Sequence, residues 1–388
     1  MQGLSILLPH LNEDFDTVKR NIDLCFKALN SLNLPGEIII LDGGSEKKII
    51  DKLMKARKLE GDSIKFEIIL DFPIIFPNKD IGIANGCARA KYENLLVIDS
   101  DFYNLTVKKI TSLAKPIIAN STSMVVANLQ RSSGRSNRLI GNPPMRLFFP
   151  EIYKEIPYPY PGAFAIKKNL LEKIIEKDFC FDWGGEAQIA INGYILSEGN
   201  VISVPLNKID TKKRKLKSIV IDSYQIYRTN ILLAIQNGRF PQSIQEIDSR
   251  MEEDIKSHPI EASKAISFMQ DKNLSPLNLY RKLAGKNDPL EIYNWLMEAS
   301  KKNKSYEYYV LANLVVKPIA DILFDKKIDD DILEIEEQNI PNLKMQEISF
   351  LADLILGGGT VVASDSAGPG NFLFSVDRAI EEMRLAMS

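Results

Sequence analysis

The sequence predicts an α/β protein, with a nucleotide-binding type of sheet in the amino-terminal part and a mostly α-helical carboxyl-terminal region. Two observations predict this class. Short apolar runs alternate with segments of helical periodicity over the first hundred residues, whereas after about residue 219 the periodicity is almost wholly helical. The length of 388 residues exceeds the usual size of one domain. We therefore expect one domain over 1–220, with parts 1–101 and 102–220, and a helical region over 221–388.

The first part is expected to alternate strands and helices. Because helices separate the strands, the strands should pair in parallel and bind ligands beyond their carboxyl ends. The strands are expected at Leu4–Leu8, Glu37–Leu41, Phe66–Leu70 and Leu95–Ile98, and the helices at Glu13–Leu32, Ser45–Leu59 (capped by Ser45) and Ile81–Lys91.

The remainder is less regular up to about residue 218 and helical thereafter. Met124–Leu129 and Val201–Pro205 have the composition of strands, and Pro- and Tyr-rich loops lie between them. Gly357–Gly370 is rich in Gly, Ser and Ala and is expected to be a mobile connector. Helices are expected at Ser223–Gln236, Ile244–Lys256, Pro259–Gln270, Leu290–Lys301, Tyr306–Leu323 and Phe374–Met387.

The charge balance argues against a general nucleic-acid binder, because 49 basic and 51 acidic side chains give a net charge of −2. No apolar run reaches the roughly 18 residues of a membrane span. No charged leader precedes an apolar run at the amino terminus, so a cytoplasmic protein is expected. Cys25, Cys87 and Cys180 have no metal-binding or redox spacing. They are expected to be small buried residues in a reducing compartment.

Four short polar segments fall at or near the carboxyl ends of the expected strands and should converge on one edge of the sheet. They are Pro9–Glu13, Asp42–Ser45, Asn78–Asp80 and Asp99–Asp101. In the last segment, two carboxylates flank Ser100. Such hard oxygen ligands suit Mg²⁺ or Mn²⁺, with a diphosphate filling the remaining positions. The alternative is a turn in which the aspartates cap the next element.

Other residues have both a functional and a structural interpretation. Asp42 could bond a nucleoside base or ribose, or belong to a Gly-rich turn. Lys79 could pair with phosphates, or be a surface lysine. The acids of Phe181–Glu186 could bind sugar hydroxyls, although Asp182 could equally cap the following helix. The basic run Lys208–Lys217 could grip a phosphate or carboxylate, or be a solvated charge run.

The order and spacing of these motifs resemble retaining glycosyltransferases of the GT-A fold, in particular the glucosyl-3-phosphoglycerate synthases and, more distantly, mannosylglycerate synthase. The resemblance covers roughly residues 4–220. It is carried by Leu8-Pro9 with Asn12-Glu13, Leu41-Asp42 with Gly44-Ser45, Lys79, Asp99-Ser100-Asp101, Ser133-Gly134-Arg135, Leu147–Pro150 with Glu151, Pro159–Gly162 with Phe164-Ala165, and Trp183–Glu186.

The resemblance implies a role for each matching position. Residues 1–101 would bind the nucleotide-sugar and residues 102–220 the acceptor, with Mg²⁺ or Mn²⁺ as cofactor. The catalytic residues would be Lys79, Asp101 and Glu186. The nucleotide-sugar would contact Pro9, Leu11, Glu13, Asp42, Lys79 and Ser100, with Gly162 and Glu186 beside the transferred sugar; the acceptor's carboxylate or phosphate would meet Arg135 and Asn137.

The chain departs from the family pattern in three places. No histidine follows Val201–Pro205 where the family supplies a metal ligand; Asp210 or Thr211 occupies the place, and Asp210 is expected to join Asp99 and Asp101 as a ligand. Pro161-Gly162-Ala163 replaces a Ser-Gly-Glu sequence. Lys212-Lys213 replaces an asparagine near the acceptor, and Lys213 favours an anionic one.

The expected activity is retaining transfer of glucose or mannose from a UDP- or GDP-sugar to glycerate, 3-phosphoglycerate or a similar small anion, by a homodimer. Three alternatives stay open. One is inverting transfer to a polysaccharide or lipid, with Asp182 or Glu186 as the base. The others are a nucleotidyltransferase, although Leu8–Asn12 lacks the usual Gly-rich basic loop, and a non-catalytic sugar-nucleotide sensor.

Overall fold

The computed structural model describes residues 2–60, 64–68, 79–131, 142–177, 184–211 and 244–257, together with positions 226, 229, 230, 233, 234, 236–240 and 267. The described residues fall into two units. One contains those of 1–137 and 150–214, and the other contains those of 138–149 and of the chain after 214. The expected boundary at residue 220, and the division at 101, stay predictions.

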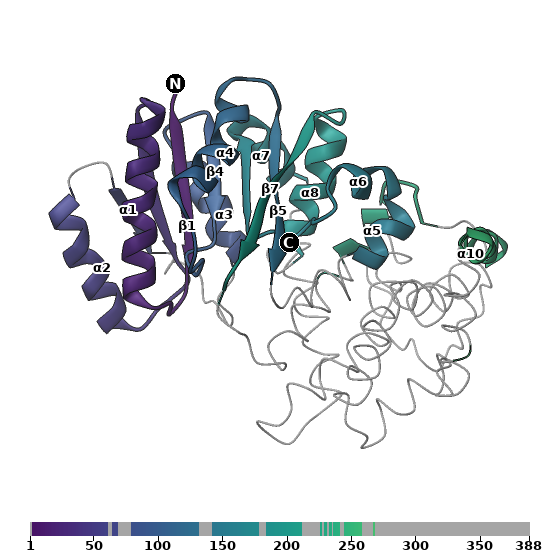
Figure 1. Ribbon diagram of the computed structural model, residues 1–388, viewed down its shortest axis with the longest axis horizontal. Helices are drawn as coiled ribbons and strands as arrows, with labels where there is room; N and C mark the ends of the chain where they lie inside the picture. Colours follow the sequence, from purple (N-terminus) through teal and green to yellow (C-terminus); the bar gives the residue numbers. More distant parts are fainter. Residues whose placement is uncertain are drawn as a thin grey trace, which may run out of the picture. The chain divides into compact units, whose positions relative to one another are not determined.

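The first unit is built on a seven-stranded sheet of order β3-β2-β1-β4-β6-β5-β7 (Figure 1). β1 pairs in parallel with β2 and β4, and β2 pairs in parallel with β3, as the sequence predicts. β6 is antiparallel to both its neighbours. The strands are β1 (Leu4–His10), β2 (Gly36–Asp42), β3 (Ile64–Ile68), β4 (Asn94–Ile98), β5 (Met124–Arg131), β6 (Ala163–Lys167) and β7 (Val201–Ile209).

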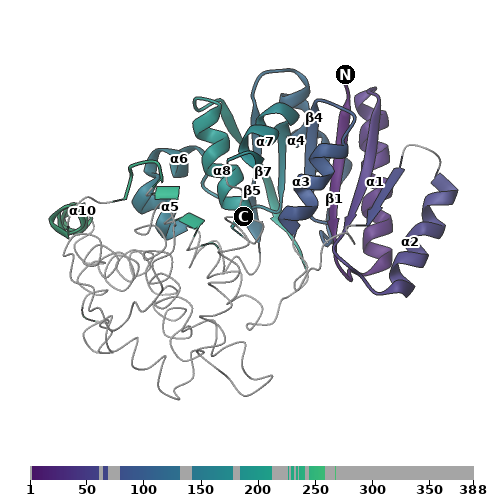
Figure 2. The ribbon, with the colours of Figure 1, turned by 180° about the vertical axis from the view of Figure 1, so that it is seen from behind.

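Helices pack on both faces of the sheet. α1 and α4 contact each other on one face, and α2 lies beside α1 (Figure 1). α3, α7 and α8 follow one another on the opposite face (Figure 2). The helices of this unit are α1 (Phe15–Leu32), α2 (Lys47–Glu60), α3 (Lys79–Arg89), α4 (Val107–Ile118), α6 (Pro150–Glu155), α7 (Lys168–Ile175) and α8 (Gly185–Leu196).

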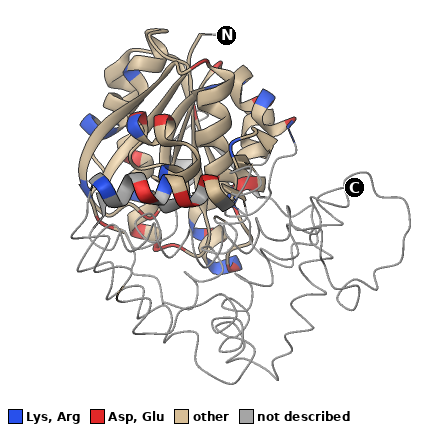
Figure 3. Cartoon of the chain, turned by 90° about the vertical axis from the view of Figure 1, so that its right-hand side faces the viewer, with Lys and Arg blue, Asp and Glu red and all other residues tan. Residues whose placement is uncertain are grey.

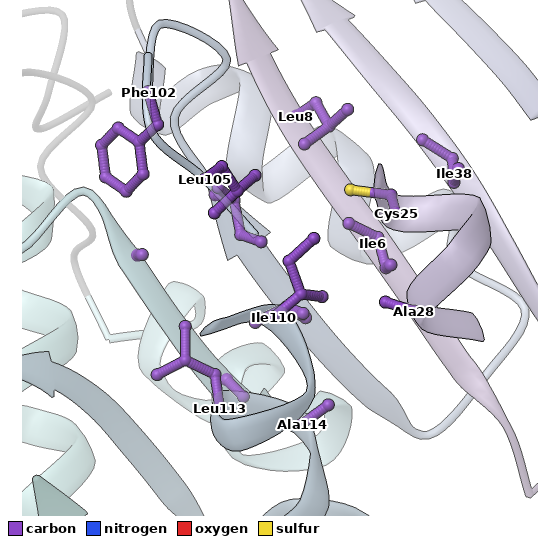
Figure 4. Close-up of a cluster of buried hydrophobic side chains, with 14 of the residues drawn as sticks. Ile6, Leu8, Cys25, Ala28, Ile38, Phe102, Leu105, Ile110, Leu113 and Ala114 are labelled. Carbon is purple, nitrogen blue, oxygen red and sulfur yellow. The ribbon is translucent and has the colours of Figure 1, made fainter. Parts of the chain in front are cut away.

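The core beneath α1 and α4 explains why the central strands are continuous apolar runs. Strands covered on both faces need apolar side chains at successive positions. Leu4–Leu8 contains four fully buried apolar residues, and alternate ones face α1. Cys25 of α1 lies over Ile6 and Leu8 of β1 (Figure 4). Burial raises the pKa of the Cys25 thiol to about 12, and that of Cys87, also buried, to about 12. The expected burial of these two cysteines is confirmed, and Cys180 lies outside the described residues.

Strand directions bring several loops to one edge. β1, β2 and β4 all end there, with His10 opposite Asp42. β6 runs the other way, so its beginning, where Ala163 pairs with Ile98, lies at the same edge. β7 is parallel to β5 and ends there too. The loops after β1, β2, β4 and β7 and the loop before β6 therefore share this edge of the sheet.

Several elements differ from the sequence prediction. α1 begins at Phe15, after the cap residue Asp14, rather than at Glu13. β3 and α3 begin two residues earlier than predicted. The Ser45 hydroxyl donates to Asp42 and accepts from Asn12 instead of capping α2. β7 continues beyond Pro205 to Ile209, because it is an edge strand with an irregularity opposite Asn128/Leu129, where a proline is tolerated.

The second unit has its own apolar contacts. The ring of Phe148, at the end of α5 (Asn142–Phe148), stacks on Phe240 with centroids 5.6 Å apart. Arg250 of α10 (Ile244–Ser257) donates to the carbonyl of Leu147 over 3.0 Å. α10 confirms the helix expected at Ile244–Lys256, and the described positions of Ser223–Gln236 are helical. The expected helices 290–301, 306–323 and 374–387 and the connector 357–370 lie outside the described residues, as does all of 259–270 except one helical position, 267.

The surface agrees with the balanced composition. Over the described part of the face in Figure 3, Lys and Arg are interspersed with Asp and Glu. None of the described helices is long and apolar enough to span a membrane.

Candidate active site

The turn after β4 carries the Asp99-Ser100-Asp101 motif and is held by its backbone N–H groups. Asp99 N–H donates to the carbonyl of Gly162 over 2.8 Å, and Ser100 N–H donates to the carbonyl of Pro9 over 3.3 Å. Gly162, at φ +67°, has the left-handed backbone that favours glycine. The fold thus brings the acid-bearing turn next to two other positions, Pro9 and Gly162, that the sequence singled out.

Lys79 joins this turn to the start of α8. Its Nζ lies 2.5 Å from Oδ1 of Asp99 and also forms an ion pair with Oε1 of Glu186. The side chains are mostly enclosed, with exposed fractions of 10% for Lys79 and Glu186 and 19% for Asp99. Burial alone would lower the pKa of Lys79, but the two carboxylates outweigh it and hold that pKa well above its ordinary value. Three predicted residues therefore meet in one charged cluster.

Asp80 explains how Glu186 reaches Lys79. The Asp80 side chain is buried, and its Oδ2 accepts a hydrogen bond of 3.1 Å from the backbone N–H of Gly185 in the first turn of α8. A Cβ atom at Gly185 would lie 2.4 Å from the Asp80 carboxyl carbon, so only glycine permits this approach. Sequence reasoning missed this role of Asp80. The available signal was the glycine pair before Glu186, which allows close approach of another residue.

Asp42 faces inward. It is fully buried, and its Oδ2 accepts from the backbone N–H groups of Gly44 (3.1 Å) and Ser45 (2.9 Å). Its Oδ1 accepts from the Ser45 hydroxyl over 2.5 Å. Gly44 supports this turn with φ +99°. The structure therefore shows the turn-forming arrangement, and contact between Asp42 and a nucleotide stays a prediction.

His10 lies between the ends of β2 and β4. It is 4% exposed, with Nε2 3.9 Å from Oδ1 of Asp42 and Nδ1 3.5 Å from the Ser100 hydroxyl. Burial lowers the pKa of His10, and the nearby Asp42 carboxylate only partly opposes this. His10 is therefore a neutral imidazole that is buried beneath the edge of the sheet where β1, β2 and β4 end.

The loop after β1 is tied to the loop after β2. Asn12, at φ +51°, donates through its backbone N–H to the Ser45 hydroxyl over 2.8 Å. Its side-chain oxygen accepts from the N–H of Glu46 over 2.7 Å. Leu11 and Glu13 flank Asn12 and are partly exposed, so they lie where a ligand above the edge could reach them.

Asp210 lies directly beside the acid-bearing turn. Its carbonyl accepts from Tyr103 N–H over 2.8 Å, and its N–H donates to the Asn104 side chain over 3.0 Å. Its carboxylate is bonded to Asn104 Nδ2 (3.1 Å) and paired with Lys208 Nζ (3.2 Å). In the described part of the chain, no three His, Cys, Asp or Glu side chains cluster closely enough to hold a metal ion. A role for Asp210 as the third ligand stays a prediction.

Asp99 and Asp101 fit a hard divalent cation. Both offer carboxylate oxygens, and Asp99 already holds the Lys79 ammonium, which shows that this position accepts a positive charge. The predicted acceptor residues Arg135, Asn137 and Lys213 lie outside the described residues, as do Asp182 and the part 212–217 of the basic run.

A parallel sheet with one antiparallel strand between β4 and β5, and two acids on the turn after β4, define a GT-A type of nucleotide-sugar transferase fold. Residues 5–175 match the family model described as "Glycosyl transferase family 2". This match confirms the expectation that the chain is a glycosyltransferase. None of the curated proteins matches it.

Solved structures with the same fold include glucosyl-3-phosphoglycerate synthase from Mycobacterium tuberculosis. Its complex with phosphoglyceric acid is 20% identical, with a TM-score of 0.50 over 59% of this chain and 79% of that chain. Its complex with Mn²⁺, UDP-glucose and phosphoglyceric acid is 20% identical, with a TM-score of 0.51 over 60% of this chain and 80% of that one. At this identity, the likeness confirms the GT-A fold expected from the sequence.

Proposed function

We propose that this glycosyltransferase moves a hexose, glucose or mannose, from a UDP- or GDP-sugar to glycerate, 3-phosphoglycerate or a similar small anion, with retention at the anomeric carbon. The observation that carries the proposal is the Lys79 ammonium held between Asp99 and Glu186. Lys79 joins Asp99, which is expected to hold the cation with Asp101, to Glu186, which is expected to bind the sugar. The solved structure with the same fold that contains Mn²⁺, UDP-glucose and phosphoglyceric acid supports this choice of ligands.

Asp99 and Asp101 would hold Mg²⁺ or Mn²⁺. When bound, such an ion neutralises the charge that builds up on the departing nucleoside diphosphate. Lys79 is protonated at neutral pH, since its pKa is raised. Its ammonium would bond to the same leaving group and stabilise it in a largely enclosed site. Pro9, Leu11, Glu13, Asp42 and Ser100 would contact the nucleotide.

The reaction breaks the bond between the anomeric carbon and the diphosphate oxygen and forms one from that carbon to the acceptor oxygen. The acceptor proton passes to the diphosphate oxygen on the same face, which gives retention. Glu186 is paired with Lys79 and would bind sugar hydroxyls beside Gly162 rather than attack the anomeric carbon. Arg135, Asn137 and Lys213 would bind the acceptor's carboxylate or phosphate. The expected homodimer stays a prediction that light scattering would test.

The test is a product assay on the purified full chain. UDP-glucose, GDP-glucose and GDP-mannose are each combined with glycerate or 3-phosphoglycerate and MnCl₂, and the first-formed product is examined by NMR. The proposal predicts a glycosylated acid with the anomeric configuration of the nucleotide-sugar, and no product from Asp101→Asn. An inverted anomer would replace the retaining mechanism with the inverting alternative. Pyrophosphate release from a nucleoside triphosphate and a sugar phosphate would indicate a nucleotidyltransferase instead.

A further inference from the structure

Asn21 of α1 supports the acid-bearing turn from behind. It is fully buried. Its Nδ2 donates to the carbonyl of Ser100 over 3.0 Å and to the carbonyl of Phe102 over 2.9 Å. These two carbonyls belong to the residues on either side of Asp101. One side-chain amide therefore holds a carbonyl of the residue before and a carbonyl of the residue after one of the expected metal ligands.

Arg20 supports the same contact from the helix surface. Its Nη2 donates to the carbonyl of Phe102 over 2.7 Å and to Oδ1 of Asn21 over 3.1 Å. Because Arg20 is a donor only, it requires the oxygen of the Asn21 amide on its side, which leaves Nδ2 facing the turn. The guanidinium of Arg20 thus sets the orientation of the Asn21 side-chain amide.

The position of Asn21 is otherwise apolar. The buried face of α1 also carries Val18, Ile22 and Cys25, which pack into the core beneath the sheet. A buried amide on such a face costs free energy unless its hydrogens are bonded. Both bonds from Asn21 Nδ2 go to the acid-bearing turn rather than to its own helix, so the residue links the helix to that turn.

Further hydrogen bonds hold the N–H groups of this turn. Asp99, Ser100 and Tyr103 donate to Gly162, Pro9 and Asp210, respectively. Asn21 and Arg20 donate to its carbonyl groups. With the peptide group before Asp101 held at the Ser100 carbonyl and the following residue held at the Phe102 carbonyl, the direction in which the Asp101 side chain leaves the backbone is restricted. Ligand oxygens for a cation and diphosphate need placement to within about 0.5 Å.

We propose that Asn21, assisted by Arg20, is a positioning residue that holds Asp101 in the orientation that binds the cation and the nucleoside diphosphate. This inference rests on the proposed function. It is tested with Asn21→Asp, which keeps the volume of the side chain but removes both donated hydrogen bonds. Binding of UDP in the presence of Mn²⁺ is measured by calorimetry on the full chain, so that the readout does not depend on turnover.

Asn94→Asp is a matched control. Asn94 is also buried and donates to a backbone carbonyl, that of Gly3, over 2.8 Å, but it lies at the opposite end of β4. Asn21→Asp should weaken Mn²⁺-dependent UDP binding about tenfold or more, because Asp101 would no longer be held in the orientation that the cation requires. Asn94→Asp should stay within about twofold of the wild-type affinity. Both variants are expected to lower the melting temperature.

Arg20→Met keeps the test decisive if Asn21→Asp does not fold. Arg20 is exposed, and the substitution should weaken binding about threefold. Asp101→Asn is the reference and should abolish Mn²⁺-dependent UDP binding. If it does, unchanged UDP affinity in folded Asn21→Asp would overturn the inference. If Asn21→Asp does not fold, unchanged UDP affinity in Arg20→Met would overturn it. Unchanged affinity in Asp101→Asn would instead overturn the proposed metal site itself.

Discussion

The ammonium of Lys79 forms an ion pair with the carboxylate of Glu186, 107 positions further along the chain. Lys79 is the first residue of α3, and Glu186 lies in the first turn of α8. The pair exists because the Asp80 carboxylate receives the N–H of Gly185, which brings the starts of two helices together. Asp99 completes the cluster from the turn after β4. A largely enclosed cation placed between acids from two other elements is a poor device for stability alone, because burying charges offsets much of their attraction.

Lys79→Met should reduce sugar transfer by roughly 100-fold, the usual cost of removing one group that stabilises developing negative charge. Initial rates with UDP-glucose and 3-phosphoglycerate measure the effect. Lys19→Met is the control, since Lys19 pairs with Asp23 on the exposed side of α1, where an ion pair contributes only about 0–1 kcal/mol. Equal rates in both variants would show that Lys79 has no part in the transfer.

Gly185→Ala should disrupt the contact between α3 and α8, because the added methyl group would lie 2.4 Å from the carboxyl carbon of Asp80. We expect a loss of about 1–3 kcal/mol in the free energy of unfolding, the usual cost of overpacking, with a raised KM for the nucleotide-sugar. Urea unfolding and steady-state kinetics measure the two effects.

Asp80→Ala in the Gly185→Ala background should recover part of that stability, since it removes the clashing carboxylate. Strict additivity of the two single substitutions in the double variant would contradict the contact, because residues in contact couple.

His10 should make stability depend on pH. Its pKa is lowered in the folded chain by burial, so the unfolded chain binds more protons. The stability that comes from neutral His10 is therefore fully present above the ordinary histidine pKa of about 6.5. As pH falls below that value, the free energy of unfolding decreases by up to about 1.4 kcal/mol per pH unit for one proton. Urea unfolding between pH 7.5 and 5 should show a smaller loss in His10→Gln than in the wild type. The same slope in both would contradict this assignment.

The buried thiols of Cys25 and Cys87 should not react in the native chain. Burial raises both pKa values to about 12, so almost no thiolate forms at neutral pH. In a Cys180→Ser background, a chromogenic disulfide reagent should label no thiol at pH 8 and two thiols in urea. Rapid labelling of the native variant would show that one of these sites opens readily.

The sequence predicted the central strands well, because β1, β2 and β4 are buried on both faces and carry runs of apolar side chains. It did not predict β6, whose Ala163–Lys167 run is short and follows a proline-rich loop. It also missed the passage of β7 through Pro205, which depends on the strand being at the edge. These features are set by neighbours in the sheet rather than by local composition.

The sequence also predicted part of the candidate site, namely the residues that carry charge, but not the contacts that position them. A strand end identified Asp99, and segments that precede or open a helix identified Lys79 and Glu186; the structure brings the three together. Asp80, Asn21 and His10 contact residues distant in the chain, and local sequence does not identify those partners. Asp42 was identified as a polar residue at a strand end, but only the structure shows that its carboxylate holds the turn to Ser45.

Calorimetric titration of UDP into the full chain, first with Mn²⁺ and then with EDTA, tests most directly whether Asp99 and Asp101 hold a cation and a diphosphate together. Binding is expected to require the metal and to disappear in the isosteric variant Asp101→Asn, whose fold is checked by circular dichroism. Equal affinity with EDTA, or an unchanged affinity in Asp101→Asn, would contradict it.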